Sequence, residues 1–333
     1  MARVITYMDA IGEALEQEMR RDPTVIAFGE DSIGGMGCDG ELGNAWGPTR
    51  GLHAKLPGQI FDAPITEAAF VGAAATGLRP VADLLFIDFA GVCFDQLLNQ
   101  AAKLRYMTGG KARVPMVVRA MWGTGLRRGA QHSQALLPLF AHIPGLKVVA
   151  PATPYDAKGL LAQAIRDDNP VIFFEHKMLY FTTGDVPENP YTVPFGQAAV
   201  VRQGADCTIV AVGRMVHVAL QAAGELAGAG VDCEVIDPRT ISPLDEEAIY
   251  ASVDKTGRLV VVDEANPRCG FAAEVAGLVA QHRFRSLRAP VRTVTAPHAP
   301  VPFSPALEDA YAPDPERVMA AVREIAGVPQ PVA

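Results

Sequence analysis

Short apolar runs separated by helical patterns fill the first half of the chain. Five of these runs have the length and the β-branched content of buried strands: Val25–Phe28, Val81–Ile87, Pro115–Val118, Leu146–Ala150 and Val171–Phe174. Apolar residues at helical spacing predict four helices between them: Met8–Arg20, Glu67–Thr76, Phe94–Tyr106 and Pro154–Arg166. Thr153 before Pro154 is a typical helix start. This alternation predicts a parallel sheet covered by helices.

The second half repeats the alternation after a break. Gly184–Gly196 contains three prolines and has no apolar period, so it is expected to be a linker. The strands expected beyond it are Thr208–Val212, Cys233–Ile236, Leu259–Val262 and Val291–Thr295. The expected helices are Met215–Ala227, Asp245–Val253, Ala272–His282 and a final one within Pro313–Ala326. We therefore expect an α/β protein with two parallel-sheet domains, residues 1–190 and 191–333.

Composition narrows the function classes. The 333 residues are 49% hydrophobic and 20% charged, which is typical of a globular chain with two cores. The net charge of −8 and the lack of a basic run argue against nucleic acid as a partner. No apolar run has the length of a membrane span or signal peptide. The five cysteines form no CxxC pair, which disfavours a zinc site or a disulfide framework and fits a reducing cytoplasm.

Four features could carry chemistry, and each has an ordinary structural alternative. Glu67 stands at a predicted helix start, where an acidic residue is also favoured by the helix dipole. His132 lies in a polar connection and could be a general acid/base or a loop histidine bonded to backbone. Phe89 and Phe94 could offer a ring platform for a cofactor, although core packing is more common. Ala164–Pro170 could bind a hard cation through oxygens or form a plain turn.

The glycine-rich segment Gly34–Gly47 suggests a nucleotide-binding loop at first sight. It has neither the Walker lysine nor the GxGxxG spacing, and no helix pattern follows it. A surface loop is the favoured interpretation.

An ordered set of motifs runs through nearly the whole chain: PITEAAFVG (64–72), the stretch from GLRPVADLLF to RYMTGGK (77–111), AQHSQ (130–134), PGLKVVAP (144–151), DAKGLLAQAIRDDNPVIFFEHK (156–177) and PFSPALED (302–309). Together these motifs resemble the β subunits of 2-oxo acid dehydrogenase E1 components. Several stretches are most similar to the acetoin dehydrogenase type: FAGVCFDQ, GRMVHVA (213–219), DEANPRCGFAA (263–273) and TAPHAPVPFSPALED (295–309).

The resemblance implies a transketolase-type pyrimidine-binding domain, a transketolase C-terminal domain and thiamine diphosphate as cofactor. Glu67 matches the glutamate that bonds N1′ of the aminopyrimidine, where a carboxylate favours the tautomer able to take the thiazolium C2 proton. Phe89 matches the aromatic residue that stacks on the pyrimidine, and His132 matches a histidine that faces the substrate and helps proton transfer or acylation of the lipoyl group. The residues that match the family's potassium loop are Met116, Ala164, Ile165, Asp167 and Asn169.

The resemblance also implies partners. The family forms α2β2 heterotetramers with the cofactor between α and β, and passes the acyl unit to a lipoyl-bearing E2. No GDG motif with a later asparagine occurs here, so Mg²⁺ on the diphosphate is expected to be held by the α subunit. The helix after Glu67 is about one turn shorter than the family pattern.

The leading hypothesis is therefore an acetoin dehydrogenase β subunit, active only with α. A pyruvate or branched-chain 2-oxo acid enzyme and a non-catalytic scaffold remain alternatives, and a stand-alone transketolase-like enzyme is disfavoured because the GDG-type metal site is missing.

Overall fold

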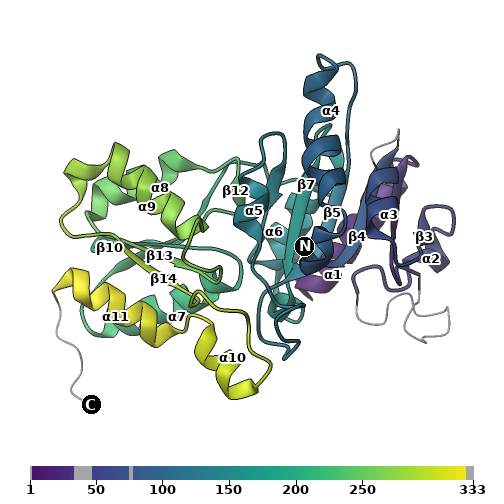
Figure 1. Cartoon of the computed structure of the whole chain (residues 1–333). Helices are drawn as coiled ribbons and strands as arrows, with labels where there is room; N and C mark the ends of the chain where they lie inside the picture. Colours follow the sequence, from purple (N-terminus) through teal and green to yellow (C-terminus); the bar gives the residue numbers. More distant parts are fainter. Residues whose placement is uncertain (1, 34–46, 75–77, 328–333) are drawn as a thin grey trace. The chain divides into compact units, whose positions relative to one another are not determined.

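The computed structural model describes residues 2–33, 47–74 and 78–327. The chain forms two compact units (Figure 1). Unit 1 comprises residues 1–122 and 139–195, and unit 2 comprises residues 123–138 and 196–333. The segment 123–138 thus belongs to unit 2, although it lies within the sequence range expected for the first domain. Each unit is described by itself below.

Unit 1 is built on a parallel sheet with the strand order β6-β7-β5-β4-β2-β3. The core strand β7 is buried at every position, as an apolar run enclosed on both faces should be. Helices α1 and α6 pack on each other, and α3 packs on the π-helical turn η2. The strands are β2 (Val25–Gly29), β3 (Ile60–Asp62), β4 (Arg79–Phe86), β5 (Val117–Trp122), β6 (Lys147–Val149) and β7 (Val171–His176). The helices are α1 (Tyr7–Arg21), α2 (Leu52–Lys55), α3 (Glu67–Ala73), η1 (Ile87–Gly91), η2 (Gln96–Ala101), α4 (Ala102–Met107), α5 (Leu137–Ala141), α6 (Pro154–Arg166) and η3 (Lys177–Leu179).

Local sequence sets the helix boundaries. Thr153 caps α6 by accepting a hydrogen bond from the Asp156 amide, and Pro154 occupies the first turn, as its fixed φ favours. Thr6 caps α1 in the same way through the Asp9 amide. The predicted helix at Phe94–Tyr106 is present, but residues Gln96–Ala101 within it form a π-helical turn that leads directly into α4. The apolar spacing in the sequence could not predict this π turn, in which each backbone hydrogen bond spans one residue more than in an α-helix.

The expected linker is structured at its start. Residues Thr183–Pro187 form strand β8, which pairs antiparallel with β1 (Ala2–Thr6). The prolines suggested a break, but Pro187 sits at the strand end, where the missing N–H costs little. The linker prediction was therefore wrong for its first residues.

Unit 2 contains a second sheet with the order β14-β13-β10-β11-β9, in which only β9 is antiparallel. Helices α7 and α11 cover one face and α8 and α9 the other (Figure 1). The strands are β9 (Ala199–Arg202), β10 (Cys207–Ala211), β11 (Cys233–Asp237), β12 (Thr240–Ser242), β13 (Leu259–Asp263) and β14 (Arg292–Thr295). The helices are α7 (Arg214–Gly228), α8 (Glu246–Thr256), α9 (Phe271–His282), η4 (Phe284–Ser286), α10 (Pro305–Tyr311) and α11 (Pro315–Ala326).

These two units confirm the predicted α/β class with parallel-dominated sheets. Most of the glycine-rich segment (34–46) and the end of the expected helix after Glu67 (75–77) lie outside the described residues. Within the residues that are described, no helix combines the length and apolar character needed to cross a bilayer.

Candidate functional site

Glu67 lies at the carboxyl edge of the unit 1 sheet, the edge where parallel α/β sheets usually bind ligands. It is the first residue of α3 and is only 7% exposed. Glu30 follows β2, and burial together with the negative charges of Glu67, Asp31 and Asp83 raises its pKa. Burial and the charge of Glu67 also raise the pKa of the Cys93 thiol to about 12. Glu67 therefore lies among groups whose pKa values its charge helps to raise, and shifted pKa values of this kind cluster at functional sites.

Phe89 lies beside a distorted strand end. The register between β4 and β5 shifts between Asp83 and Phe86, and Leu85 adopts a left-handed φ of 62°. The Asp83 side chain accepts a hydrogen bond from the Leu85 amide and so stabilises this bulge. The bulge leads into η1, where Phe89 packs edge-on against Phe86 with centroids 6.1 Å apart. A strained non-glycine residue beside a partly exposed aromatic pair is typical of a functional site.

A buried ion-pair network adjoins this edge, and the sequence analysis missed it. The Arg119 guanidinium on β5 donates to both Glu175 oxygens at 2.6 and 2.9 Å and to Asp83 at 3.2 Å. The Tyr180 hydroxyl donates to Glu175 at 2.7 Å. Burial acts to lower the pKa of Arg119, but the two carboxylates more than reverse this and raise it. Charged residues inside the strand runs VVRAMW and VIFFEH were the available signal.

His132 lies in unit 2, within the segment 123–138, and not in the unit that carries Glu67 and Phe89. Its neighbours Ala130, Ser133 and Gln134 line a cavity of about 280 Å³. The opposite wall of the cavity is formed by residues of the unit 2 core and its loops: Glu264, Asn266, His298, Ala299, Pro300, Val301 and Tyr311. The cavity therefore has room for a small molecule or a flexible chain beside the segment 123–138, which carries His132.

Asp263 ends β13 in the same unit, and burial raises its pKa from 3.8 to about 6. Because the folded pKa exceeds the unfolded one, this group stabilises the fold fully below about pH 3.8, and the contribution is lost as pH rises through about 6. We expect Asp263→Asn, which stays neutral, to raise the free energy of unfolding above pH 6 by at most about 3 kcal/mol. Urea unfolding across this pH range should show the gain disappear on acidification. A gain that is independent of pH would contradict the assignment.

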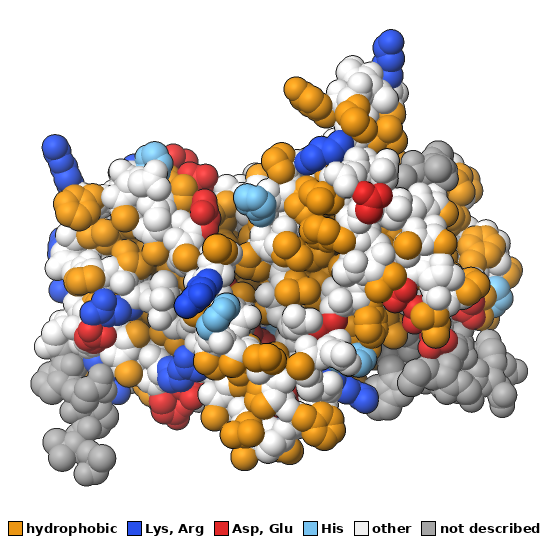
Figure 2. Space-filling view, in the orientation of Figure 1, with side chains coloured by type: hydrophobic (Ala, Val, Ile, Leu, Met, Phe, Trp, Pro, Cys, Tyr) orange, Lys and Arg blue, Asp and Glu red, His pale blue; other side chains and the backbone are white. Residues whose placement is uncertain are grey.

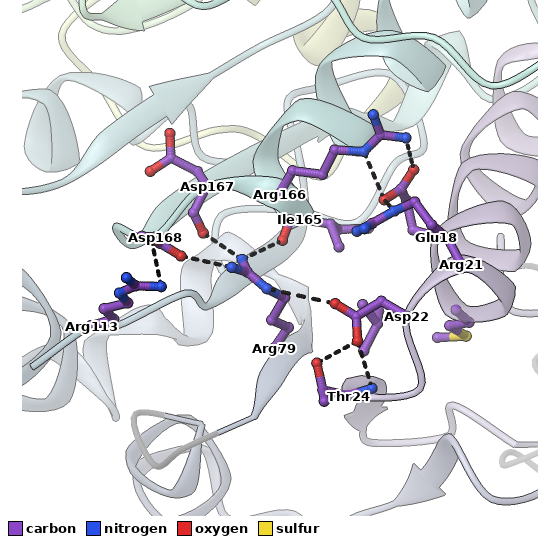
Figure 3. Close-up of polar contacts among 12 residues, drawn as sticks. Glu18, Arg21, Asp22, Thr24, Arg79, Arg113, Ile165, Arg166, Asp167 and Asp168 are labelled. Atoms are coloured by element: carbon purple, nitrogen blue, oxygen red, sulfur yellow. Dashed lines mark hydrogen bonds and ion pairs between the residues drawn. The ribbon is translucent and has the colours of Figure 1, made fainter.

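The residues of the expected potassium loop lie together at the opposite, amino edge of the unit 1 sheet. The Ile165 and Asp167 carbonyl oxygens both accept from Nη1 of Arg79, at 3.1 and 3.0 Å (Figure 3). The Met116 carbonyl accepts from the Val171 amide, and the Ala164 carbonyl accepts from the Asp167 amide. The cationic group that these two carbonyls bind in the structure is therefore the Arg79 guanidinium.

Further cationic side chains surround this loop. Arg79 also donates to the Asp168 carboxylate at 2.7 Å, and Arg113 pairs with the same group (Figure 3). Arg105 donates to Oδ1 of Asn169 at 3.0 Å, and Lys147 pairs with the Asp167 side chain. These contacts hold the loop between α6 and β7 in one conformation.

No group of three or more His, Cys, Asp or Glu side chains is placed to share a metal ion within residues 2–33, 47–74 and 78–327.

Comparison with known families and structures agrees with this architecture. Residues 3–182 match the transketolase pyrimidine-binding domain family, and residues 196–318 match the transketolase C-terminal domain family. A solved split-gene transketolase, described as an inactive β4 tetramer, superposes with a TM-score of 0.77 at 24% identity, over 98% of this chain and 100% of that one. This likeness shows the fold.

Curated relatives match over almost the full length. The β subunits of the acetoin:2,6-dichlorophenolindophenol oxidoreductases of Cupriavidus necator and Bacillus subtilis are 57% and 51% identical, over 97% and 99% of this chain and 98% and 99% of theirs. The β subunit of the Bacillus subtilis 2-oxoisovalerate dehydrogenase is 40% identical over 97% of this chain and 99% of its own. The chain therefore belongs to the family of β subunits of thiamine-dependent 2-oxo acid and acetoin dehydrogenase E1 components.

Proposed function

We propose that this chain is the β subunit of an E1 component that cleaves acetoin with thiamine diphosphate and passes the acetyl unit to a lipoyl group on E2. The observation that carries this proposal is the gap in identity between classes of relatives. Acetoin:2,6-dichlorophenolindophenol oxidoreductase β subunits are 57% and 51% identical, whereas the 2-oxoisovalerate and a Rickettsia felis pyruvate dehydrogenase β subunit are 40% and 43% identical. The near-buried glutamate at the carboxyl edge of the sheet supports the same chemistry.

The residues at this edge fit an aminopyrimidine ring. When bound, thiamine diphosphate would supply an electron sink for cleavage of the C–C bond. Glu67 would hold a proton at N1′ of that ring, and Phe89 would pack against the ring face. His132 would assist proton transfer as the acetyl unit passes to the lipoyl group. All three roles are proposals that activity measurements on variants can test.

An α subunit is the proposed partner, and it would hold the Mg²⁺ that neutralises the diphosphate. Apolar side chains at the end of α4 support such a contact: Tyr106 is 88% exposed and Met107 is 64% exposed. Figure 1 shows α4 projecting from unit 1, and Figure 2 shows hydrophobic side chains along this projection. Large apolar side chains that are exposed side by side in the sequence can mark a protein interface. We further propose an α2β2 assembly and a cytoplasmic location, which suits the free thiols of Cys93, Cys207, Cys233 and Cys269.

We also propose that the loop of Met116, Ala164, Ile165, Asp167 and Asn169 binds K⁺. The carbonyls of Ile165 and Asp167 already accept from Arg79, but a carbonyl oxygen has two lone pairs and can contact a second electropositive group. Replacing KCl by choline chloride at equal ionic strength should lower the thermal midpoint of the assembled enzyme by a few degrees. NaCl serves as the control for the size of the cation. Equal midpoints in KCl and choline chloride would refute the potassium site.

The substrate proposal is tested with the chain co-expressed with its α partner. Turnover of acetoin, pyruvate and 2-oxoisovalerate is compared with 2,6-dichlorophenolindophenol as electron acceptor and added thiamine diphosphate. The proposal expects acetoin to have the highest kcat/KM. Turnover of branched 2-oxo acids alone would assign the chain to that enzyme class. A well-formed tetramer that binds no thiamine diphosphate in calorimetry would favour the scaffold alternative.

A further inference from the structure

The segment 123–138, which carries His132, has little regular structure of its own. It starts after β5 ends at Trp122 and reaches helical geometry only at α5. Four of its first seven residues have a left-handed φ: Gly123 at 87°, Gly125 at 110°, Arg127 at 56° and Gly129 at 70°. Such a backbone cannot satisfy its amide groups through helix or sheet hydrogen bonds. Two of its amides bond within the segment, that of Gly123 to the Gln134 carbonyl and that of His132 to the Gly129 carbonyl. The amides of Thr124, Gly125 and Arg127 bond side chains from elsewhere in unit 2.

Two buried carboxylates of unit 2 supply those partners. Glu308 on α10 accepts from the Gly125 amide at 2.9 Å through Oε1 and from the Arg127 amide at 3.1 Å through Oε2. Its Oε2 also accepts from the Arg127 guanidinium at 2.8 Å. Glu264, which follows β13, accepts from the Thr124 amide. Three backbone amides within four residues are therefore bound by carboxylate oxygens.

Burial makes these contacts strong. The side chain of Glu308 is 1% exposed, and Glu264 is 2% exposed. A buried carboxylate is costly unless hydrogen bonds compensate for lost water, and charge-assisted bonds to backbone amides do so effectively. If the segment moved away, both carboxylates would lose these partners. The buried charges therefore hold the segment in one position.

We propose that Glu308 and Glu264 are positioning residues for His132. They act on the backbone that carries the imidazole, and through Ala130, Ser133 and Gln134 they also fix one wall of the adjoining cavity. This inference rests on the proposed function, because it assigns the clamp to the histidine that would assist acyl transfer. Errors of about 1 Å in the placement of a reacting group can lower rates about 10²-fold.

The test uses the co-expressed αβ enzyme with Glu308→Gln and, independently, Glu264→Gln. Glutamine keeps the size of glutamate but loses the charge and one of the two acceptor oxygens. We expect Glu308→Gln to lower kcat by about 10²-fold with a smaller change in KM, and to speed amide hydrogen exchange across residues 123–135. Glu264→Gln, which weakens the bond from the Thr124 amide, should have the same effects to a smaller extent. The matched control is Asp309→Asn, because Asp309 is 68% exposed and accepts from the Arg127 guanidinium.

A double-mutant cycle with His132→Ala separates positioning from general stability. If Glu308 acts through His132, Glu308→Gln should have almost no further effect on kcat in the His132→Ala background. An undiminished effect in that background, or unchanged exchange across 123–135, would overturn the positioning role. A fully active His132→Ala enzyme would also overturn it, while the acetoin assignment would stand. Wild-type enzyme that does not turn over acetoin would instead refute the proposed function itself.

Discussion

Glu67→Gln in the co-expressed αβ enzyme should lower kcat for acetoin oxidation by about 10²–10⁴-fold, the range that a positioned proton-transfer group contributes. Glutamine fills the same volume at the start of α3 but cannot exchange a proton with the aminopyrimidine ring. Because Glu67 is almost completely buried, a water molecule cannot easily take over the role of its carboxylate in proton transfer. Steady-state turnover with 2,6-dichlorophenolindophenol measures the loss, and calorimetry with thiamine diphosphate shows whether the cofactor still binds.

A matched control is available in the same unit. Glu16 on α1 forms surface ion pairs with Arg20 and Lys55, and Glu16→Gln makes the identical chemical change away from the sheet edge. Exposed pairs contribute little, so this variant should keep wild-type kcat. If Glu67→Gln retained more than half of wild-type activity, the assignment of Glu67 as the proton-transfer group would be untenable.

The sequence predicted the interior of the fold better than its margins. Strands such as Val171–His176 are buried on both faces, so their apolar runs are continuous and their positions follow directly. Among the described residues, β1 and β8 form a two-stranded sheet of their own, and β9 is an antiparallel edge strand. Their positions depend on partners distant in sequence, which periodicity in a short window cannot identify. The bulge at Leu85 was hidden for the same reason, because it exists only in the pairing of β4 with β5.

The candidate site was harder to predict from the sequence than the fold. Taken alone, Glu67 looked like an ordinary first-turn acid, and only the family motifs singled it out. The structure adds its burial and the perturbed pKa of Glu30, which require the β2 and β3 strand ends to be side by side. The position of His132 in unit 2 could not be predicted, because it follows from contacts of Gly125 and Arg127 with Glu308, far along the chain. The roles of these residues stay predictions until variants are measured.

Arg119→Met is expected to destabilise unit 1 by about 3–5 kcal/mol, which corresponds to a thermal midpoint lower by roughly 6–20 °C. Asp83 and Arg119 are direct register partners on β4 and β5, and Glu175 lies two residues beyond the β7 partner of Arg119, on the same face. All three side chains are nearly inaccessible. Removing the guanidinium would therefore leave two carboxylates buried without their counter-ion. Thermal unfolding of the assembled enzyme measures the effect.

The loss of stability in Arg119→Met should come from the two buried carboxylates left without a counter-ion, and not from the loss of the Arg119 contacts themselves. Neutralising them as well, in the triple variant Arg119→Met, Asp83→Asn and Glu175→Gln, should therefore recover much of the lost stability, because a neutral buried cluster needs no counter-ion. Arg292→Ala provides the contrast, since Arg292 and Glu324 form an exposed pair whose removal should leave the thermal midpoint nearly unchanged. If the triple variant were less stable than Arg119→Met alone, the network would have to act through its geometry, with Tyr180 and the Leu85 bulge depending on Glu175 and Asp83 for their hydrogen bonds.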